Sequence, residues 1–343
     1  MESPAMGGDD SALQILSFVL YLAFGTWQFP VYTDFMGKSG HNLRHFLSVT
    51  DLTPPEFRSL LDDAIRLKDR WLSTLKGRSV AILFEKPSLR TRVSFEMAIR
   101  QLGGQAIYLS PQEVGLGTRE SVPDVARVLG RYVDGIVLRT FAQKNLEEMA
   151  KYGGVPVVNA LSDYEHPCQA LADLLTVYEK KGKLKGLTLA YVGDGFNVAN
   201  SLMLACAMMG MNFRIASPKG YTVRKDVQVK AQRYAKDSGA EIACTTDPAA
   251  AVKGADVVYT DAWTSMGQEA EAEVRRRAFA SYQVNEKLFS LAKKNAIFMH
   301  CLPAHHGEEV TDAVLEGGRS VVFDQAENRL HAQKALIARL LAK

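Results

Sequence analysis

Short apolar runs alternate with helical patterns from Phe46 to the end of this 343-residue chain. The apolar runs predict strands, and the stretches between them, in which apolar residues recur every three to four positions, predict helices. This alternation is typical of α/β proteins with parallel sheets, in which ligands bind at the carboxyl ends of the strands. The predicted strands cover residues 80–84, 106–109, 135–138, 155–159, 187–192, 213–216, 257–260, 297–299 and 321–323.

The length of the chain and one basic segment indicate two domains. A chain of 343 residues exceeds the usual size of a single domain, and Lys180 to Lys183 (K-K-G-K) is the best candidate for a boundary. We expect two doubly wound α/β domains, each with a central, mainly parallel sheet flanked by helices, and an active site in the cleft between them. The first domain covers residues 42–181 and the second covers 182–326, and a C-terminal helix over 327–343 packs back on the first domain.

The first forty residues differ from the rest of the chain. Leu13 to Val31 is almost uncharged, so it must be weighed as a membrane anchor or an export signal. A signal peptide begins with basic residues, whereas Met1 to Asp10 carries only acidic charges. As a spanning helix the segment is interrupted by Gly25 and Pro30. We interpret residues 1–41 as an extension outside the fold with no membrane role, and recovery in the detergent phase would favour the anchor instead.

The charge and the cysteines narrow the possible functions. A formal net charge of +3 is small, and no run of Lys and Arg is interleaved with aromatic residues, so we expect no nucleic-acid partner. The four cysteines show neither the paired spacing of a zinc site nor the density of a disulfide framework. We therefore expect a cytoplasmic protein whose ligands are small molecules.

The segment Glu85 to Arg92 (E-K-P-S-L-R-T-R) lies between a predicted strand and a predicted helix. Because apolar residues with helical spacing begin directly after it, its last residues form the first helical turn. N–H groups of a first turn lack intrahelical partners and favour anions, and hydroxyl and guanidinium side chains add further donors here. These side chains are Ser88, Arg90, Thr91 and Arg92. The segment predicts a phosphate site, and the alternative is a capped helix whose arginines form surface ion pairs.

Polar residues also stand at the ends of four other predicted strands. In the first half, Arg139 ends one strand, and the segment His166 to Gln169 (H-P-C-Q) begins the helix after another. In the second half, Asp261 to Gly267 (D-A-W-T-S-M-G) and His300 to Ala304 (H-C-L-P-A) follow two more strands. The first half thus supplies cations and neutral donors, and the second supplies an acid and small polar groups. This pairing suits transfer of an electrophilic group from a phosphorylated donor to an ammonium-bearing acceptor in a cleft.

Three other site types are less favoured by the sequence. Gly193-Asp194-Gly195 follows a strand, but the third glycine of a dinucleotide fingerprint would fall at Val198 and no acidic residue ends the next strand. The His-Cys pairs at 300–301 and 166–168 lack further ligands at metal spacing, so we expect no metal. Cys301 as a nucleophile would need an orienting base that the sequence does not reveal, and a thiol lining an amine pocket is the alternative.

These motifs resemble those of the aspartate/ornithine carbamoyltransferases. Ser88 to Arg92 (S-L-R-T-R) resembles the family motif S-T-R-T-R, and His166 to Gln169 resembles H-P-x-Q. Asp261 with Ser265 to Gly267, and His300 to Pro303 (H-C-L-P), are similar to the ornithine branch, which carries D-x-x-x-S-M-G and H-C-L-P. The resemblance covers residues 44–343 and includes the segment D-Q-A-E-N-R at 324–329.

The resemblance implies a role for each matching residue toward carbamoyl phosphate. The phosphate is expected to be held by Ser88, Leu89 through its backbone, Arg90 and Thr91. Arg139 bridges the phosphate and the carbonyl oxygen. The carbamoyl end is expected to contact His166, Gln169, Cys301, Leu302 and Arg329. Donors on the carbonyl oxygen stabilise the charge that develops in the transition state, so we expect Arg139, His166, Cys301 and Arg329 to be the catalytic residues.

The resemblance also implies the second substrate and the assembly. Asn197, Ser265 and Met266 are expected to bind the amino-acid end of ornithine, and Asp261 is expected to lie near its amino groups. No metal or organic cofactor is implied. The family forms trimers with sites at subunit interfaces, so a homotrimer or a multiple of trimers is expected.

The expected reaction transfers the carbamoyl group of carbamoyl phosphate to the side-chain amine of L-ornithine, giving L-citrulline and phosphate. A role in arginine biosynthesis follows, although catabolic citrulline breakdown uses similar enzymes. Putrescine or an N-acylated ornithine as acceptor, or a ligand-binding relative without catalysis, are the alternatives.

Three positions depart from the family pattern. Leu89 stands where Thr is usual, so one hydroxyl is absent from the phosphate site. Gly115 lies where relatives often carry a Gln that reaches the neighbouring subunit, and Phe196 replaces an Asn before Asn197.

Overall fold

The computed structural model describes residues 45–265 and 267–342. The expected extension over residues 1–41 lies outside the described residues, and so does Met266. None of the helices in the described ranges is long and apolar enough to cross a membrane.

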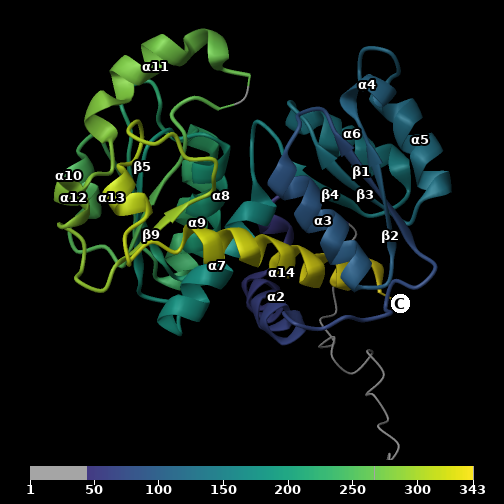
Figure 1. Cartoon of the computed structure of the whole chain (residues 1–343), viewed down its shortest axis with the longest axis horizontal. Coiled ribbons are helices and arrows are strands. Elements are labelled where there is room, and N and C mark those ends of the chain that lie inside the picture. Colours follow the sequence, from purple (N-terminus) through teal and green to yellow (C-terminus); the bar gives the residue numbers. More distant parts are fainter. Residues whose placement is uncertain (1–44, 266, 343) are drawn as a thin grey trace, which may run out of the picture. The chain divides into compact units, whose positions relative to one another are not determined.

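The first half of the described chain is built on a four-stranded parallel sheet in the order β2-β1-β3-β4 (Figure 1). Its strands are β1 (Ser79–Phe84), β2 (Gln105–Leu109), β3 (Gly135–Arg139) and β4 (Val157–Leu161). β3 is buried along its whole length, as expected for a central strand covered on both faces. The helices of this half are η2 (Val49–Asp51), α2 (Pro54–Leu67), α3 (Leu89–Gln101), α4 (Pro111–Val114), α5 (Val122–Tyr132), α6 (Gln143–Gly153) and α7 (Pro167–Lys181).

The second half carries a five-stranded parallel sheet in the order β7-β6-β5-β8-β9. Its strands are β5 (Thr188–Val192), β6 (Asn212–Ala216), β7 (Ile242–Thr245), β8 (Val257–Thr260) and β9 (Ile297–His300). Its helices are α8 (Asn197–Met209), α9 (Lys225–Ser238), α10 (Pro248–Val252), η3 (Glu269–Glu271), α11 (Ala272–Phe279), η4 (Ala280–Tyr282), α12 (Glu286–Phe289) and α13 (Asp312–Leu315). The two parallel sheets with their flanking helices confirm the predicted fold class.

Local sequence signals account for the helix starts that lie near the strand ends. The Thr53 hydroxyl accepts from the Glu56 N–H, the Glu56 carboxylate accepts from the Thr53 N–H, and Pro54 takes the first position of α2. Ser88 caps α3, and Pro167 occupies the first position of α7 directly after His166. The phosphate-site segment and the H-P-C-Q segment therefore each begin a helix, as the sequence predicts.

The last helix, α14 (Val322–Leu341), packs against α2, α3 and α7 (Figure 1). The sequence prediction of a strand over residues 321–323 is wrong, because Val321 caps α14 and the helix begins at Val322 rather than near Asn328. Only Ser320 bridges the sheet, opposite Phe298. Phe323 is 69% exposed, whereas Val321 and Val322 are buried. This pattern is expected of the first turn of a helix that buries one of its faces and exposes the other.

Three further elements, β4, β7 and α6, differ from the sequence prediction. The strand predicted at 155–159 begins at Val157, because Pro156 has no N–H to donate and the strand pairs with Phe46 on its outer side. The sequence did not predict β7, an edge strand whose short apolar run, Ile242 to Cys244, contains no buried residue. Helix α6 was not predicted from the sequence either, although Leu146, Met149 and Ala150 have the spacing of an amphipathic helix.

Candidate active site

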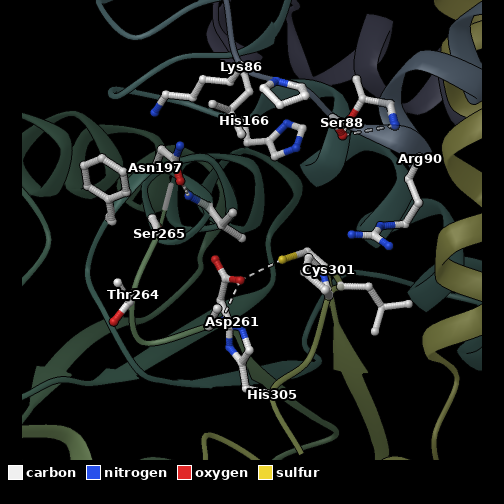
Figure 2. A pocket seen from close by; sticks show the side chains of 18 of the residues that line it. Lys86, Ser88, Arg90, His166, Asn197, Asp261, Thr264, Ser265, Cys301 and His305 are labelled. Atoms are coloured by element: carbon white, nitrogen blue, oxygen red, sulfur yellow. Dashed lines mark hydrogen bonds between the residues drawn. The ribbon is translucent and has the colours of Figure 1, made fainter. Parts of the chain in front are cut away.

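A cavity of about 630 Å³ lies at the carboxyl ends of both sheets, and its walls come from both halves of the chain (Figure 2). The structure brings most of the predicted site residues to this cavity. Its lining includes Ser88, Leu89, Arg90, Thr91, Arg139, His166, Asn197, Asp261, Ser265, Cys301, Leu302 and Arg329. Gln169 is buried behind the wall, and Met266 lies outside the described residues. In Figure 2, Ser88 and Arg90 lie on one side of the cavity, Asn197 and Ser265 on the other, and His166 and Cys301 between them.

The first turn of α3 forms one wall of the cavity. Ser88 accepts from the Thr91 N–H at 3.4 Å, and its hydroxyl donates to Thr91 Oγ1 at 3.0 Å. Helix geometry leaves the first N–H groups of α3 without intrahelical partners, so this wall presents donors to the cavity.

Three arginines, Arg90, Arg139 and Arg329, line the cavity beside the start of α3 and form an arginine cluster. Arg139 is 5% exposed, and its Nε has no hydrogen-bond partner among the described residues. Burial, together with Arg329 and Arg90, lowers the pKa of Arg139 to about 10, although Cys301 acts in the opposite direction. Within residues 45–265 and 267–342, none of the three arginines forms an ion pair with a carboxylate. Three like charges with no carboxylate in direct contact suit an oxyanion such as phosphate.

His166 stands at the start of α7 and is neutral. Burial, then Arg329 and Arg139, hold the pKa of its imidazole well below the usual value. The His166 N–H of the backbone donates to Ser201 Oγ at 3.0 Å, whereas the ring Nδ1 has no partner in the described structure. A neutral imidazole carries one N–H donor, which can bind a carbonyl oxygen without adding a full charge to the arginine cluster.

Gln169 connects the arginine cluster to a buried carboxylate. Its Oε1 accepts from Arg329 at 2.6 Å, and its Nε2 donates to Asp173 at 2.8 Å. Since a carboxylate only accepts and a guanidinium only donates, these two neighbours determine which way the amide points. Asp173 also accepts from Gln325 at 2.7 Å and from the Tyr259 hydroxyl at 3.1 Å, so α7, β8 and α14 converge on one carboxylate.

Asp173 makes the stability of the fold depend on pH. Burial raises the pKa of its carboxyl to about 7, because the three donors only partly offset desolvation. Between the ordinary Asp pKa and that value the folded state holds a proton that the unfolded state has lost, so this group reduces stability as pH rises. Asp173→Asn keeps the shape and does not titrate. We expect the urea midpoint of the variant, relative to that of the unsubstituted chain, to rise from pH 5 to pH 8; a constant difference would contradict a raised pKa.

Asp261 and Cys301 form the polar pair on the wall that the second sheet contributes. The Cys301 thiol donates to Asp261 Oδ1 at 2.9 Å, and the Ala262 N–H donates to the same atom at 2.8 Å. Burial, together with Asp261, raises the pKa of the thiol well above its ordinary value. Because the thiolate is the nucleophilic form, the geometry favours Cys301 as a thiol donor in an amine pocket over a covalent nucleophile.

Asn197 and Ser265, which are predicted to bind the acceptor, both form hydrogen bonds within the chain. Asn197 lines the cavity, but its Nδ2 donates to the Ser162 carbonyl at 2.6 Å and its Oδ1 accepts from the Val198 N–H at 2.8 Å. Ser265 also lines the cavity, and its N–H donates to Gln268 at 3.1 Å. Contact of either residue with an amino acid stays a prediction.

Among the residues that the structure describes, two groups of side chains bring potential metal-ligand atoms within 4.8 Å of one another. They are Asp261, His300 and Cys301, and His305, Glu308 and Glu309. In the first group His300 accepts from the Leu302 N–H through Nδ1 and bonds Glu309 through Nε2, so both ring nitrogens are engaged. The Cys301 thiol is engaged as well, since it donates to Asp261 Oδ1.

Sequence reasoning missed several residues of the cavity wall. They are Lys86, Thr264, Glu269, Arg276, His305 and Glu308. Lys86 is buried, its Nζ lies 4.0 Å from the centre of the Phe141 ring, and burial followed by Arg139 lowers its pKa. Its position at the carboxyl end of β1, inside the phosphate segment, was a usable signal. Thr264 lies inside the segment Asp261 to Gly267 that was singled out from the sequence. Glu269 in η3, Arg276 in α11, and His305 and Glu308 lie outside the motifs.

The backbone conformation at position 115 explains why glycine stands there. It ends α4 with a φ of 55°, and a side chain there would meet Arg119 Cβ at 2.7 Å. A Gln at this position would therefore require the 115–119 turn to change.

The unusual Leu89 has little effect on the wall itself. Its side chain is 76% exposed, and its place in the first turn of α3 leaves the backbone N–H available. We expect Leu89→Thr to leave turnover equal or to improve it, because a hydroxyl is added beside the oxyanion site. Steady-state kinetics with varied carbamoyl phosphate would measure this, and a large loss of turnover would show that the Leu89 side chain supports the site.

Comparisons with known proteins identify the family of the chain. Residues 44–179 match the family model of the aspartate/ornithine carbamoyltransferase carbamoyl-P binding domain, and residues 185–340 match that of the Asp/Orn binding domain. An ornithine carbamoyltransferase of Hyperthermus butylicus is 56% identical over 306 residues, which cover 87% of this chain and 98% of that protein. One of Anoxybacillus flavithermus is 53% identical over 303 residues, with 87% and 96% covered. The structure of ornithine carbamoyltransferase from Pyrococcus furiosus superposes with a TM-score of 0.85 at 50% identity, covering 87% of this chain and 97% of that one. The chain therefore belongs to the aspartate/ornithine carbamoyltransferase family.

Proposed function

We propose that the chain transfers the carbamoyl group of carbamoyl phosphate to the side-chain amine of L-ornithine, giving L-citrulline and phosphate. One observation carries the proposal. Arg90, Arg139 and Arg329 meet without a carboxylate partner in the described structure, and the same cavity holds the Asp261–Cys301 pair. The first group suits a dianionic phosphate, and the second suits an amine.

The donor is held by the first half of the chain. Ser88, Arg90 and Thr91 bind the phosphate oxygens, and the α3 start adds its N–H groups. Arg139 bridges phosphate and carbonyl oxygen, and Gln169 accepts from the carbamoyl NH₂. The fixed orientation of the Gln169 amide supports this assignment, since its carbonyl points toward Arg329 rather than toward Asp173.

The chemical step is attack of a neutral amine on the carbamoyl carbon. As the new C–N bond forms, negative charge collects on the carbonyl oxygen, which the His166 N–H, Arg139 and Arg329 stabilise. One such donor is worth on the order of 3 kcal/mol. Collapse of the tetrahedral intermediate breaks the C–O bond, phosphate leaves with that electron pair, and the phosphate takes the proton that the amine loses. Desolvation in the closed cleft, where the Cys301 thiol lies close by, lowers the pKa of the bound amine.

The choice of acceptor is tested by the product formed. Carbamoyl phosphate is incubated with ornithine, putrescine, N-acetylornithine or aspartate, and reactions without protein correct for spontaneous carbamoylation. We expect citrulline from ornithine at a kcat/KM at least ~100-fold above that for the other amines, because a site that hydrogen-bonds its substrate rejects analogues that lack the bonded group. Preference for putrescine or N-acetylornithine would overturn the acceptor, and no turnover with any amine would overturn the enzyme.

We further propose that the working form is a homotrimer or a multiple of trimers in the cytoplasm, with residues 42–181 and 182–326 as its two domains. Family membership supports the trimer. Light scattering after size-exclusion chromatography should give three chain masses or a multiple of three.

A further inference from the structure

One motif of the second half has no part in the reaction described above. Asp194, in the Gly193-Asp194-Gly195 turn after β5, is buried and forms an ion pair with Arg275 of α11, which is buried as well. Neither residue lines the cavity. A buried ion pair is costly to desolvate, and it stabilises a fold only when its geometry and further hydrogen bonds compensate. The partners of Arg275 show what this pair holds in place.

Arg275 connects Asp194 to the segment that follows β8. Its Nε donates to the Trp263 carbonyl at 2.8 Å, and a second guanidinium nitrogen, Nη2, donates to Asp194 Oδ2. The guanidinium carbon lies 4.9 Å from the centre of the Tyr221 ring and 5.8 Å from that of Phe279. The Trp263 ring stacks on Phe279 with the two centres 6.1 Å apart. The planar guanidinium is therefore held in one orientation by two hydrogen-bond acceptors and two aromatic faces.

Both ends of this connection adjoin the cavity. Ala262 and Thr264, the neighbours of Trp263, line it, and so do Phe196 and Asn197, which follow the Asp194 turn. The turn itself cannot shift easily, because a side chain at Gly195 would lie 2.2 Å from the Val223 nitrogen. Arg275 thus ties the wall at 262–265 to a firmly packed turn beside Asn197.

We propose that Asp194 and Arg275 are positioning residues for the acceptor: they hold the 262–265 wall at the separation from Asn197 that the amino-acid end of the acceptor requires. This inference rests on the proposed function. It predicts an effect confined to the acceptor, because the donor residues Ser88 to Thr91, Arg139 and His166 belong to the first half of the chain.

Arg275→Lys is the sharpest test. Lysine keeps the positive charge beside Asp194, but one ammonium cannot reproduce the two-armed contact with Asp194 and the Trp263 carbonyl. We expect KM for ornithine to rise at least ~10-fold while KM for carbamoyl phosphate and kcat change less than about threefold, the signature of lost uniform binding of one substrate. Asp194→Asn, which removes only the charge partner, should show the same selectivity.

Arg339→Lys is the matched control. Arg339 also pairs with a buried carboxylate, Asp63, at 2.6 Å and donates to the Glu56 carbonyl at 2.9 Å, but it joins α14 to α2 and does not line the cavity. We expect this variant to leave both KM values unchanged. Calorimetric titration of ornithine in the presence of phosphate gives an acceptor affinity without turnover, and it should fall in Arg275→Lys only.

Three results would each overturn the positioning role. They are equal changes in both KM values, no change in Arg275→Lys or Asp194→Asn, and an effect on the acceptor KM of the same size in Arg339→Lys. Failure of the proposed function is a separate result, since the unsubstituted chain would then form no citrulline at all.

Discussion

Arg90→Ala is expected to lower kcat/KM for carbamoyl phosphate by about 10³-fold, equivalent to roughly 4 kcal/mol, because it removes a charged donor from the oxyanion site. Arg90 lines the cavity from the first turn of α3 and forms no ion pair within the described residues, so its charge is not used by the fold. The loss should therefore fall on substrate binding and catalysis rather than on stability. Steady-state kinetics and calorimetric titration with inorganic phosphate would measure both parts.

Arg92→Ala is the control for this prediction. Arg92 lies in the same turn, but it pairs with Glu96 at 2.8 Å, stacks on Tyr108 at 3.7 Å and does not line the cavity. We expect its kinetics to stay within about threefold of the unsubstituted chain, since surface ion pairs contribute little. Similar losses in both variants would mean that general disruption of α3, and not the loss of an oxyanion ligand, is being measured.

Asp261→Asn is expected to lower kcat/KM for ornithine by about 10²- to 10³-fold, because loss of a charge from a desolvated pair weakens recognition of a cationic acceptor. Asparagine keeps the size of the side chain and can still accept from the Cys301 thiol through its oxygen. Binding of carbamoyl phosphate should be retained. Varying each substrate in turn separates the two effects.

Asp256→Asn is the control for Asp261→Asn. Asp256 directly precedes β8, whereas Asp261 directly follows it, so the same substitution is made at opposite ends of one short strand. Asp256 pairs with Lys293 at 2.8 Å, and its loss should reduce stability without changing either KM. If Asp261→Asn weakened carbamoyl phosphate binding as strongly as ornithine binding, the assignment of Asp261 to the acceptor would be wrong.

Much of this account could be predicted from the sequence because the signals were local. The strand at Val257–Thr260 is a short apolar run, and Ser88 and Pro167 are standard helix-start residues. Since parallel strands end at a common edge, the motifs after them had to converge. The cavity collects residues from positions 86 to 329, and many of them follow strand ends for that reason.

The parts that could not be predicted depend on contacts between distant residues. Nothing in the sequence around Asp173 shows that α14 and β8 will each direct a donor at it, and nothing around Asp194 identifies Arg275 as its partner. The strand predicted at 321–323 failed for the same reason. Val321 and Val322 are buried by the packing of the α14 start and not as part of a strand.

The most direct test of the central claim follows the carbamoyl carbon itself. Carbamoyl phosphate labelled with ¹³C is mixed with ornithine and the protein, and carbon NMR detects where the label goes. We expect the label in the ureido carbon of citrulline with one phosphate released per transfer, and a loss of at least ~100-fold in rate in Arg90→Ala and in Asp261→Asn. Absence of label in citrulline, or transfer that survives both substitutions, would contradict the assignment of this cavity.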